Sequence, residues 1–253
     1  MEAGQLNGRV AIVTGAGRGI GAGIARALVA RGARVVVSDL DEAAATATTD
    51  AINRGCDAVR AMAAGVDVTC EKSVRALMRT AEETLGAPDI LINNAGVLFG
   101  TRINDISLAE WNLIVATNLT GSFLCAREVL AGMRARQRGH IVNMSSSAGR
   151  SVSTLGGAHY TAAKAGVLGL TRAIAKEVAA DGILVNAVCP GLIDTEMVRS
   201  HCTTENLQAY ERSFPIRRLG TVTEVAEVVV FLCSCASYVT GASIDVNGGD
   251  LMI

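Results

Sequence analysis

The sequence has few residues of the kinds that build metal centres, disulfide frameworks or nucleic-acid interfaces. Its three histidines are scattered, and none has the HExxH spacing or a similar ligand spacing, so we expect no catalytic metal. The seven cysteines form an odd set without a CxxC pair, which suits reduced thiols better than a disulfide framework. With 23 basic and 24 acidic residues and no block of one sign, the charge pattern argues against a nucleic-acid partner.

Long apolar runs are also missing. The N-terminus has no basic patch followed by an apolar stretch, and no uninterrupted apolar run reaches the roughly 18 residues that span a bilayer. We therefore expect a soluble, cytoplasmic protein without a membrane partner. Aromatic residues make up only 3% of the chain although half of it is hydrophobic. The core must then consist of Ala, Val, Ile and Leu, as buried parallel strands and their covering helices require.

Short β-branched runs alternate with segments of helical periodicity along the chain. The expected strands are 9–14, 34–38, 58–66, 89–92, 140–144, 183–188 and 243–246. The expected helices are 20–29, 42–53, 71–85, 107–136, 159–179 and 221–232, and capping boxes (Ser107 with Glu110, Thr221 with Glu224) would open two of them. This alternation predicts an α/β fold, with a single doubly wound (Rossmann-type) domain over 1–253 that has a seven-stranded parallel sheet and helices on both faces.

The range 193–219 is more polar than its flanks and follows a strand end, which is where a substrate-covering segment would lie. A surface excursion without function is the alternative. The ligand crevice of such a sheet lies at the carboxyl ends of its strands.

A glycine-rich segment, TGAGRGIG at 14–21, joins the first expected strand to the first expected helix. Glycines at such a turn let a pyrophosphate approach the helix N-terminus, although a merely tight turn has the same composition. Asp39 ends the second strand, roughly 20 residues further on, where a ribose 2'-hydroxyl needs an acceptor. Its carboxylate would repel a 2'-phosphate, so we expect NAD rather than NADP. Arg18 is a competing cation that could favour NADP by attracting this phosphate. Asp39 could instead be a solvated turn residue.

Tyr160 and Lys164 are four residues apart in an expected helix, so their side chains lie on one face about one turn apart. A phenol with an ordinary pKa of about 10 is a poor base near neutrality, and a neighbouring ammonium lowers that pKa. The pair therefore indicates acid/base chemistry by Tyr160 with Lys164 as its cation.

With these motifs, the sequence resembles the classical short-chain dehydrogenase/reductase family. The similarity rests on TGAGRGIG at 14–21, NNAG at 93–96, YTAAK at 160–164 and PG at 190–191, and it extends through SYVTGASIDVNGG near the C-terminus. The resemblance implies that Asn118, Ser146, Tyr160 and Lys164 are the catalytic residues. Ser147 is the alternative to Ser146, because the loop before Tyr160 is one residue longer than the commonest family spacing.

The resemblance also implies where the coenzyme binds. The implied contacts are Gly15, Arg18, Gly19, Ile20, Gly21, Asp39, Asp67, Val68, Asn94, Ala95, Gly96, Tyr160, Lys164, Pro190, Gly191, Ile193 and Thr195. Asp67 and Asn94 would flank the adenine side, and Ile193 and Thr195 would meet the nicotinamide carboxamide. Without the resemblance, Asp67 could be a strand-end cap and Thr195 a helix N-cap.

The function implied is an NAD-dependent oxidoreductase that moves a hydride between the nicotinamide and a secondary alcohol or ketone, such as a polyol or a hydroxy acid. The substrate pocket would be lined by 150–157 and 193–214. A 3-oxoacyl thioester reductase that uses NADPH is the alternative, against which Asp39 argues. A nucleotide-sensing protein that catalyses no reaction is a more remote one. The resemblance further implies a homotetramer.

Overall fold

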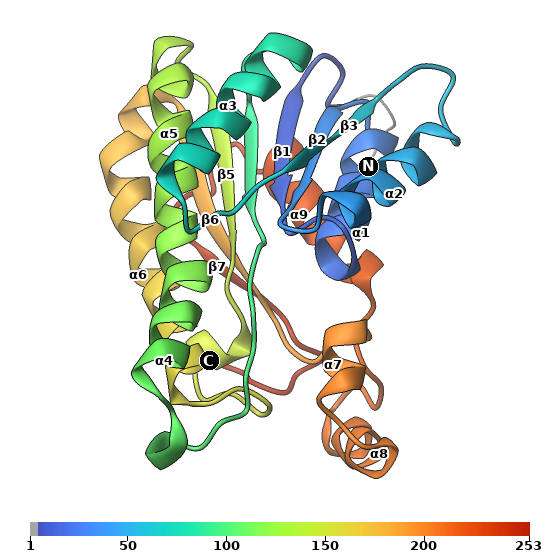
Figure 1. Ribbon diagram of the computed structural model, residues 1–253, viewed down its shortest axis with the longest axis vertical. Helices are drawn as coiled ribbons and strands as arrows, with labels where there is room; N and C mark the ends of the chain where they lie inside the picture. The colour runs from blue at the N-terminus through green and yellow to red at the C-terminus, as the bar shows by residue number, and fades with distance from the viewer. Residues whose placement is uncertain (1–4) are drawn as a thin grey trace.

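The computed structural model describes residues 5–253 and contains one parallel sheet of seven strands in the order β3-β2-β1-β4-β5-β6-β7 (Figure 1). The strands are β1 (Val10–Thr14), β2 (Arg34–Asp39), β3 (Ala61–Gly65), β4 (Ile90–Asn93), β5 (Gly139–Met144), β6 (Ile183–Pro190) and β7 (Ser243–Val246). The order reverses between β1 and β4, and the chain there crosses to the other face of the sheet. This is the doubly wound arrangement that the alternation of strands and helices predicts, and the prediction is confirmed.

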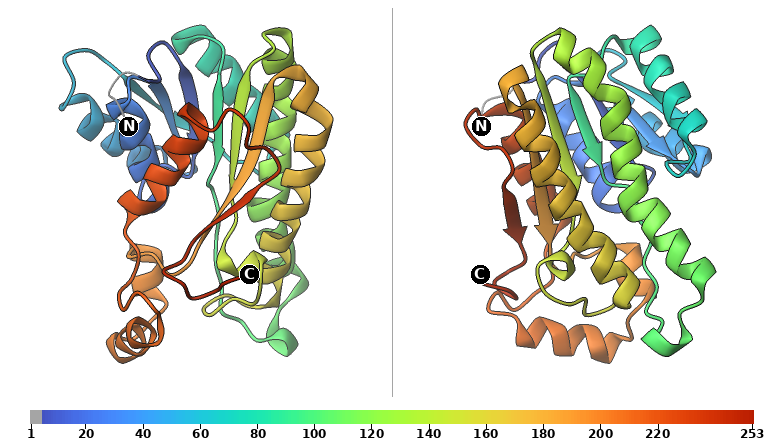
Figure 2. Two further views of the ribbon diagram at one scale, coloured as in Figure 1. Left: turned by 180° about the vertical axis from the view of Figure 1, so that it is seen from behind. Right: turned by 90° about the vertical axis from the view of Figure 1, so that its left-hand side faces the viewer.

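Helices cover both faces of the sheet (Figure 2). The helices are α1 (Gly19–Ala30), α2 (Glu42–Asn53), α3 (Glu71–Leu85), α4 (Leu108–Val115), α5 (Gly121–Ala135), α6 (Ala158–Val178), α7 (Glu196–Ser200), α8 (Thr204–Ser213) and α9 (Val222–Ser234). One apolar core lies under α1, α2 and α9, and a second lies under α3, α5 and α6. Successive residues of a strand point to opposite faces of the sheet and so enter different cores. Val13 and Val37 belong to the first core, and Ile12 and Val36 belong to the second.

Two strands differ from their expected bounds by more than one residue at one end. The expected strand 58–66 begins only at Ala61, because the side-chain oxygen of Asn53 accepts the backbone N–H groups of Arg60 and Ala61 at 2.9 Å and ends the preceding turn there. At the other end of the sheet, β6 runs on to Pro190, two residues beyond the expected end of that strand. Pro190 pairs with Val246 of β7 as the last residue of the strand, beyond the last pair of β6 with β5, which is Met144 with Val188.

The expected helix 107–136 is interrupted. A π-helical turn at Ala116–Thr120 separates α4 from α5, and it contains the predicted site residue Asn118. Hydrophobic periodicity continues through such a turn, so the sequence pattern does not reveal it. Turns of this kind occur frequently at functional sites.

The range 193–219, for which the sequence predicts no helix or strand, contains α7 and α8. A bridge between Ile193 and Gly220 joins the two ends of this segment. Both helices project beyond the carboxyl end of the sheet (Figure 1). The side chains of Thr195 and Thr203 cap them by accepting the N–H groups of Val198 and Asn206.

One helical stretch, Leu108–Ala135, is long and apolar enough to cross a membrane by length and composition, with 44% of its most apolar window buried inside the protein. This stretch comprises α4, the π turn and α5, and its buried residues Leu124, Val129 and Met133 belong to the second core. A core helix passes the same test of length and composition, so the finding is weak evidence for a membrane span.

A charged cluster at the amino end of the sheet gives a testable prediction about acid stability. Burial lowers the pKa of His140 to about 4, and the cation of Arg9 acts in the same direction. Above its ordinary pKa of about 6.5 the ring is neutral in both the folded and the unfolded chain, but between about 6.5 and 4 only the unfolded chain binds the proton. The free energy of unfolding should therefore fall by roughly 1 kcal/mol per pH unit over that window because of His140.

Urea unfolding of the parent and of His140→Gln at a series of pH values between 7 and 4 measures this contribution. The variant should show the shallower loss of stability on acidification. Parallel curves for the two proteins would contradict the prediction.

Candidate active site

The glycine turn after β1 is packed too tightly for side chains. A Cβ on Gly15 would lie 2.7 Å from the Cα of Ala95, and one on Gly21 would lie 2.3 Å from the carbonyl oxygen of Gly15. Gly15 and Gly19 also have φ values of +62° and +55°, which favour glycine. Next to this turn, α1 begins without a side-chain cap and without an acidic residue in its first turn.

The start of α1 therefore presents free N–H groups and the positive end of the helix dipole, which suit phosphate. The space above Gly19 is open, since a Cβ added at that position would have Thr195 Cγ2 as its nearest neighbour, at 3.8 Å. The turn thus fits the pyrophosphate of a dinucleotide.

Asp39 lies against this turn at the end of β2. Its Oδ2 accepts the N–H of Gly17 at 2.9 Å, and its Oδ1 accepts the N–H of Asp41 at 3.1 Å. The carboxylate is thereby held at the edge of the turn, where a ribose would follow the pyrophosphate. Arg18, the competing cation, is mostly exposed and lies 3.7 Å from the carboxylate of Glu196 at the start of α7.

Other residues expected at the coenzyme also support the loops around it. Asn94 donates from Nδ2 to the carbonyl oxygens of Thr14 and Gly15 at 3.0 and 2.8 Å, so its amide braces the glycine turn. Asp67 accepts both the N–H and the hydroxyl of Thr69, in keeping with the strand-end cap that was its alternative. The Val68 side chain is buried against the start of α5, where a Cβ on Gly121 would touch it.

Tyr160 and Lys164 share one face of α6 as predicted, with the ammonium 5.7 Å from the centre of the phenol ring. Lys164 is buried and donates from Nζ to the carbonyl oxygen of Met144 at 2.8 Å. Burial lowers the pKa of Lys164 to about 8. The ammonium is therefore held in place between α6 and the end of β5.

The expected lowering of the Tyr160 pKa is not found. Burial raises the pKa of Tyr160 to about 12, and the opposing influence is a side-chain hydrogen bond with Ser146. Loss of hydration favours the neutral phenol over the charged phenolate. Near neutral pH Tyr160 thus holds its proton, which is the form that can donate to a carbonyl oxygen.

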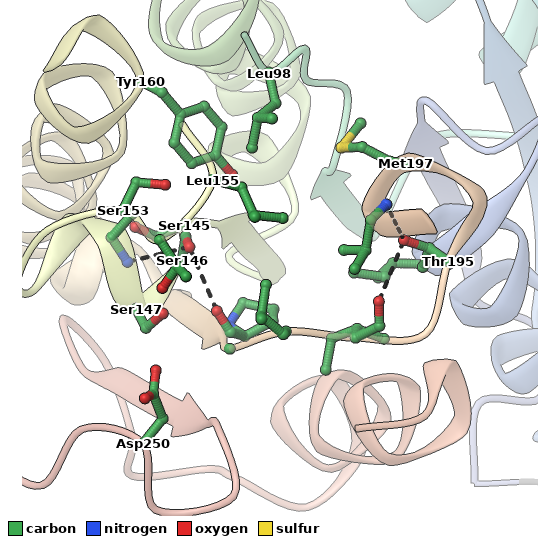
Figure 3. Close-up of a pocket in the computed structure, with 18 residues that line it drawn as sticks. Leu98, Ser145, Ser146, Ser147, Ser153, Leu155, Tyr160, Thr195, Met197 and Asp250 are labelled. Carbon is green, nitrogen blue, oxygen red and sulfur yellow. Dashed lines mark hydrogen bonds between the residues drawn. The ribbon is translucent and has the colours of Figure 1, made fainter. Parts of the chain in front are cut away.

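Among the three consecutive serines after β5, Ser146 is the one that hydrogen-bonds Tyr160. Its Oγ also accepts the N–H of Ala148 at 3.1 Å and donates to the carbonyl oxygen of Pro190 at 3.4 Å. Ser145 turns away and donates to the carbonyl oxygen of Lys164 at 2.8 Å. Ser147 lines the cleft beside Ser146 (Figure 3).

The π turn directs the amide of Asn118 toward Lys164. Its Nδ2 donates to the carbonyl oxygens of Val97 and Ile114 at 2.9 and 3.0 Å, while its buried Oδ1 has no hydrogen-bond partner within residues 5–253. A Cβ on Gly96 would lie 2.5 Å from that Oδ1 and 3.6 Å from Lys164 Nζ, so both polar atoms border the same small space. The four residues expected to be catalytic thus lie around the carboxyl ends of β4, β5 and β6.

A cleft connects Ser146 and Tyr160 with the segment after β6 (Figure 3). Its lining residues are Ile20, Leu98, Ser145, Ser146, Ser147, Ala148, Ser153, Thr154, Leu155, Tyr160, Pro190, Gly191, Leu192, Ile193, Thr195, Met197, Val198 and Asp250. The expected pocket segments, 150–157 and 193–214, account for Ser153, Thr154, Leu155, Ile193, Thr195, Met197 and Val198. Sequence reasoning missed Leu98 and Asp250, which reach the cleft from the loop after β4 and from the C-terminal segment.

Within the described part of the chain, no group of three His, Cys, Asp or Glu side chains is arranged to hold a metal ion. Thr195, expected at the nicotinamide carboxamide, caps α7 and also lines the cleft, so both of its interpretations are compatible with its position.

Known proteins similar to this chain carry the same architecture. The family described as enoyl-(acyl carrier protein) reductase matches residues 15–250. A 3-oxoacyl-(acyl-carrier-protein) reductase from Vibrio cholerae is 41% identical over 250 residues, covering 98% of this chain and all of that protein. An acetoacetyl-CoA reductase from Shinella zoogloeoides is 41% identical over 247 residues, covering 97% of this chain and 99% of that protein.

A solved structure gives the same result for the fold. The crystal structure of a 3-oxoacyl-(acyl-carrier protein) reductase from Brucella melitensis superposes with a TM-score of 0.93 at 36% identity, covering 99% of this chain and 94% of that one. The similarity therefore spans the sheet, the glycine turn and the cleft together.

Proposed function

The chain belongs to the classical short-chain dehydrogenase/reductase family, and from this premise we propose that it reduces the 3-oxo group of an acyl thioester with a nicotinamide coenzyme. The observation that carries the chemistry is the junction of Tyr160, Ser146 and Lys164 at one end of the cleft. The substrate class comes from the similar proteins, whose names include 3-oxoacyl-(acyl-carrier-protein) reductase and acetoacetyl-CoA reductase. These names favour the thioester alternative over a polyol or hydroxy-acid dehydrogenase.

Each of the three residues has a separate task in the reduction. When bound, the reduced coenzyme supplies the hydride. Tyr160 donates its phenolic proton to the carbonyl oxygen, and the Ser146 hydroxyl donates a hydrogen bond to the same oxygen as negative charge develops there. Lys164 contributes a buried ammonium beside the phenol, which stabilises the phenolate left after proton transfer.

Acetoacetyl-CoA tests the proposal directly. The purified protein should oxidise reduced coenzyme, followed by its absorbance, when acetoacetyl-CoA is added. A panel of polyols, hydroxy acids and other secondary alcohols assayed with oxidised coenzyme provides the comparison. A higher kcat/KM for any of these alcohols than for acetoacetyl-CoA would overturn the thioester as substrate.

A polyol dehydrogenase is the second candidate because of the cleft's composition. Asp250 and the hydroxyl groups of Ser147, Ser153 and Thr154 line it with hydrogen-bonding groups. Such a lining suits a substrate with several hydroxyl groups. The same panel decides between the two candidates.

For the coenzyme we propose NAD(H), on the evidence of Asp39. A carboxylate held by Gly17 and Asp41 can accept hydrogen bonds from ribose hydroxyls, whereas a 2'-phosphate would place a second negative group beside it. Arg18 would have to leave Glu196 in order to compensate.

Replacing Asp39 with Ala is therefore expected to shift preference toward NADP(H). Relief of about 1.4 kcal/mol of repulsion corresponds to a tenfold change, so the ratio of kcat/KM for NADPH to that for NADH should rise roughly tenfold or more. Initial rates with both coenzymes measure the ratio. Asp41→Ala, which leaves the Asp39 carboxylate in place, is the matched control. A parent enzyme that already prefers NADPH would contradict the coenzyme proposal.

We also propose that the chain assembles as a homotetramer. Large apolar side chains, among them Trp111, Leu113 and Phe123 of the α4–α5 stretch, are at least 37% exposed and would be covered by another copy. Sedimentation of the purified protein tests this proposal, and a monomer at micromolar concentration would overturn it.

A further inference from the structure

The helix that carries Tyr160 and Lys164 begins in an unusual way. Its N-cap is Gly157, which has no side chain to accept the first N–H groups of α6. The backbone N–H of Tyr160 instead points at the ring of the preceding residue, 3.0 Å from His159 Nδ1, and also lies 3.1 Å from the carbonyl oxygen of Gly157. The imidazole of His159 thus caps the helix by accepting the N–H of Tyr160.

The other ring nitrogen anchors this cap to a different helix. His159 is fully buried, and its Nε2 lies 2.8 Å from Oε1 of Glu110 in the first turn of α4. Because Nδ1 accepts the Tyr160 N–H, the ring proton must be on Nε2, which donates it to the carboxylate.

Glu110 is free for this contact because it does not complete the expected capping box. Ser107 Oγ accepts the N–H of Glu110 at 3.1 Å, which is half of the box, but the Glu110 carboxylate does not return to Ser107. It binds His159 and Thr101 instead, and these hydrogen bonds lower the pKa of Glu110. The capping box at Thr221 and Glu224 is complete by contrast.

The contact lies beside two segments of the cleft wall, the start of α6 and the loop after β4. The N–H of Gly157 donates to the carbonyl oxygen of Phe99 at 2.8 Å, which ties the start of α6 to the loop after β4. Leu98 of that loop and Tyr160 of α6 both line the cleft, where Figure 3 shows them side by side. A shift of the first turn of α6 would therefore move the Tyr160 ring relative to Ser146 and Leu98.

We propose that Glu110 and His159 form a positioning pair that fixes Tyr160 in the orientation required for proton transfer, without touching the substrate themselves. The inference rests on the proposed role of Tyr160 as proton donor. Glu110 is 49 residues from His159 in the sequence, and the pair links α4 to α6 independently of the sheet.

Two variants of Glu110 test the pair. Glu110→Gln keeps an oxygen that can accept the Nε2 proton and should retain a kcat within about twofold of the parent. Glu110→Ala removes the anchor, and kcat should fall by roughly 10- to 100-fold, the effect of a misplacement of about 1 Å, while KM for coenzyme changes little. The double variant Glu110→Ala with His159→Ala should be no slower than the slower single variant, because both residues act through one contact.

Asp181→Ala is the matched control, since it removes an ion pair with Arg134 at the opposite end of α6 and should leave kcat unchanged. An unchanged kcat in Glu110→Ala would overturn the proposal, as would an equal loss in Glu110→Gln. A lower melting temperature with kcat intact would show a purely structural role and overturn it as well.

A crystal structure of Glu110→Ala supplies a readout that needs no turnover. The Tyr160 hydroxyl should be displaced from Ser146, and an undisturbed ring would overturn the positioning role. If the parent reduces no carbonyl compound, the proposed function fails, whereas the position of Tyr160 in this variant still decides whether the pair orients it.

Discussion

Tyr160→Phe is expected to lose nearly all turnover while still binding coenzyme. The substitution keeps the ring that packs beside the cleft and removes only the hydroxyl that shares a hydrogen bond with Ser146. General acid catalysis is worth about 100- to 10,000-fold, so kcat should fall within that range. Steady-state rates with acetoacetyl-CoA, or with the best substrate of the panel, measure the loss, and a fluorescence titration with NADH measures binding.

The control for this prediction is Tyr238→Phe. Tyr238 is fully exposed, so removing its hydroxyl should change neither kcat nor coenzyme affinity. Normal turnover by Tyr160→Phe would refute the role of Tyr160 as proton donor. Loss of coenzyme binding together with turnover would show that the hydroxyl acts in binding rather than in chemistry.

The direction in which the Tyr160 pKa is shifted bears on the proposed proton transfer. A phenol with a pKa of about 12 is protonated across the physiological range and is ready to act as an acid. Carbonyl reduction needs that acid, whereas alcohol oxidation needs the phenolate as a base. The site thus holds the acid that the proposed carbonyl reduction needs.

The fold could be predicted from the sequence because its signals are local. Every strand except β3 is a short run that contains Val or Ile, and the glycine turn and the Tyr160–Lys164 pair are each contained within a few residues. The helices α7 and α8 escaped prediction because they are short and polar, and they are held by threonine caps rather than by an apolar face. The π turn at Asn118 escaped because it leaves the apolar periodicity nearly unchanged.

The parts of the site that sequence reasoning missed depend on contacts between distant segments. Asp250 reaches the cleft only because the chain after β7 folds back under the serine loop (Figure 3). Glu110 has the spacing of a capping-box residue, and only the packing of α4 against α6 turns its carboxylate to His159. The expectation of a lowered Tyr160 pKa was wrong for a similar reason, since burial by the surrounding segments raises that pKa.

Lys164→Met is expected to reduce both turnover and coenzyme affinity, which distinguishes it from Tyr160→Phe. Methionine has similar length and fills the buried space, so the loss should reflect the ammonium and its hydrogen bond to Met144 rather than a cavity. Hydrogen bonds of charged groups contribute about 1.5 to 3 kcal/mol, and the Kd for NADH should rise by roughly 10- to 100-fold if the ammonium also binds the coenzyme ribose. Turnover should fall at least as far, because the phenolate left after proton transfer loses its cation.

The pH dependence of the parent provides the second part of this prediction. With a pKa of about 8, Lys164 is charged below that pH and neutral above it, so the rate of reduction should decline as the pH rises past about 8. Lys164→Met should lack this decline at its lower rate, and Lys72→Met, which changes an exposed lysine on α3, should keep it. An alkaline decline that persists unchanged in Lys164→Met would assign the titration to another group, and the buried ammonium would then have no part in setting the rate.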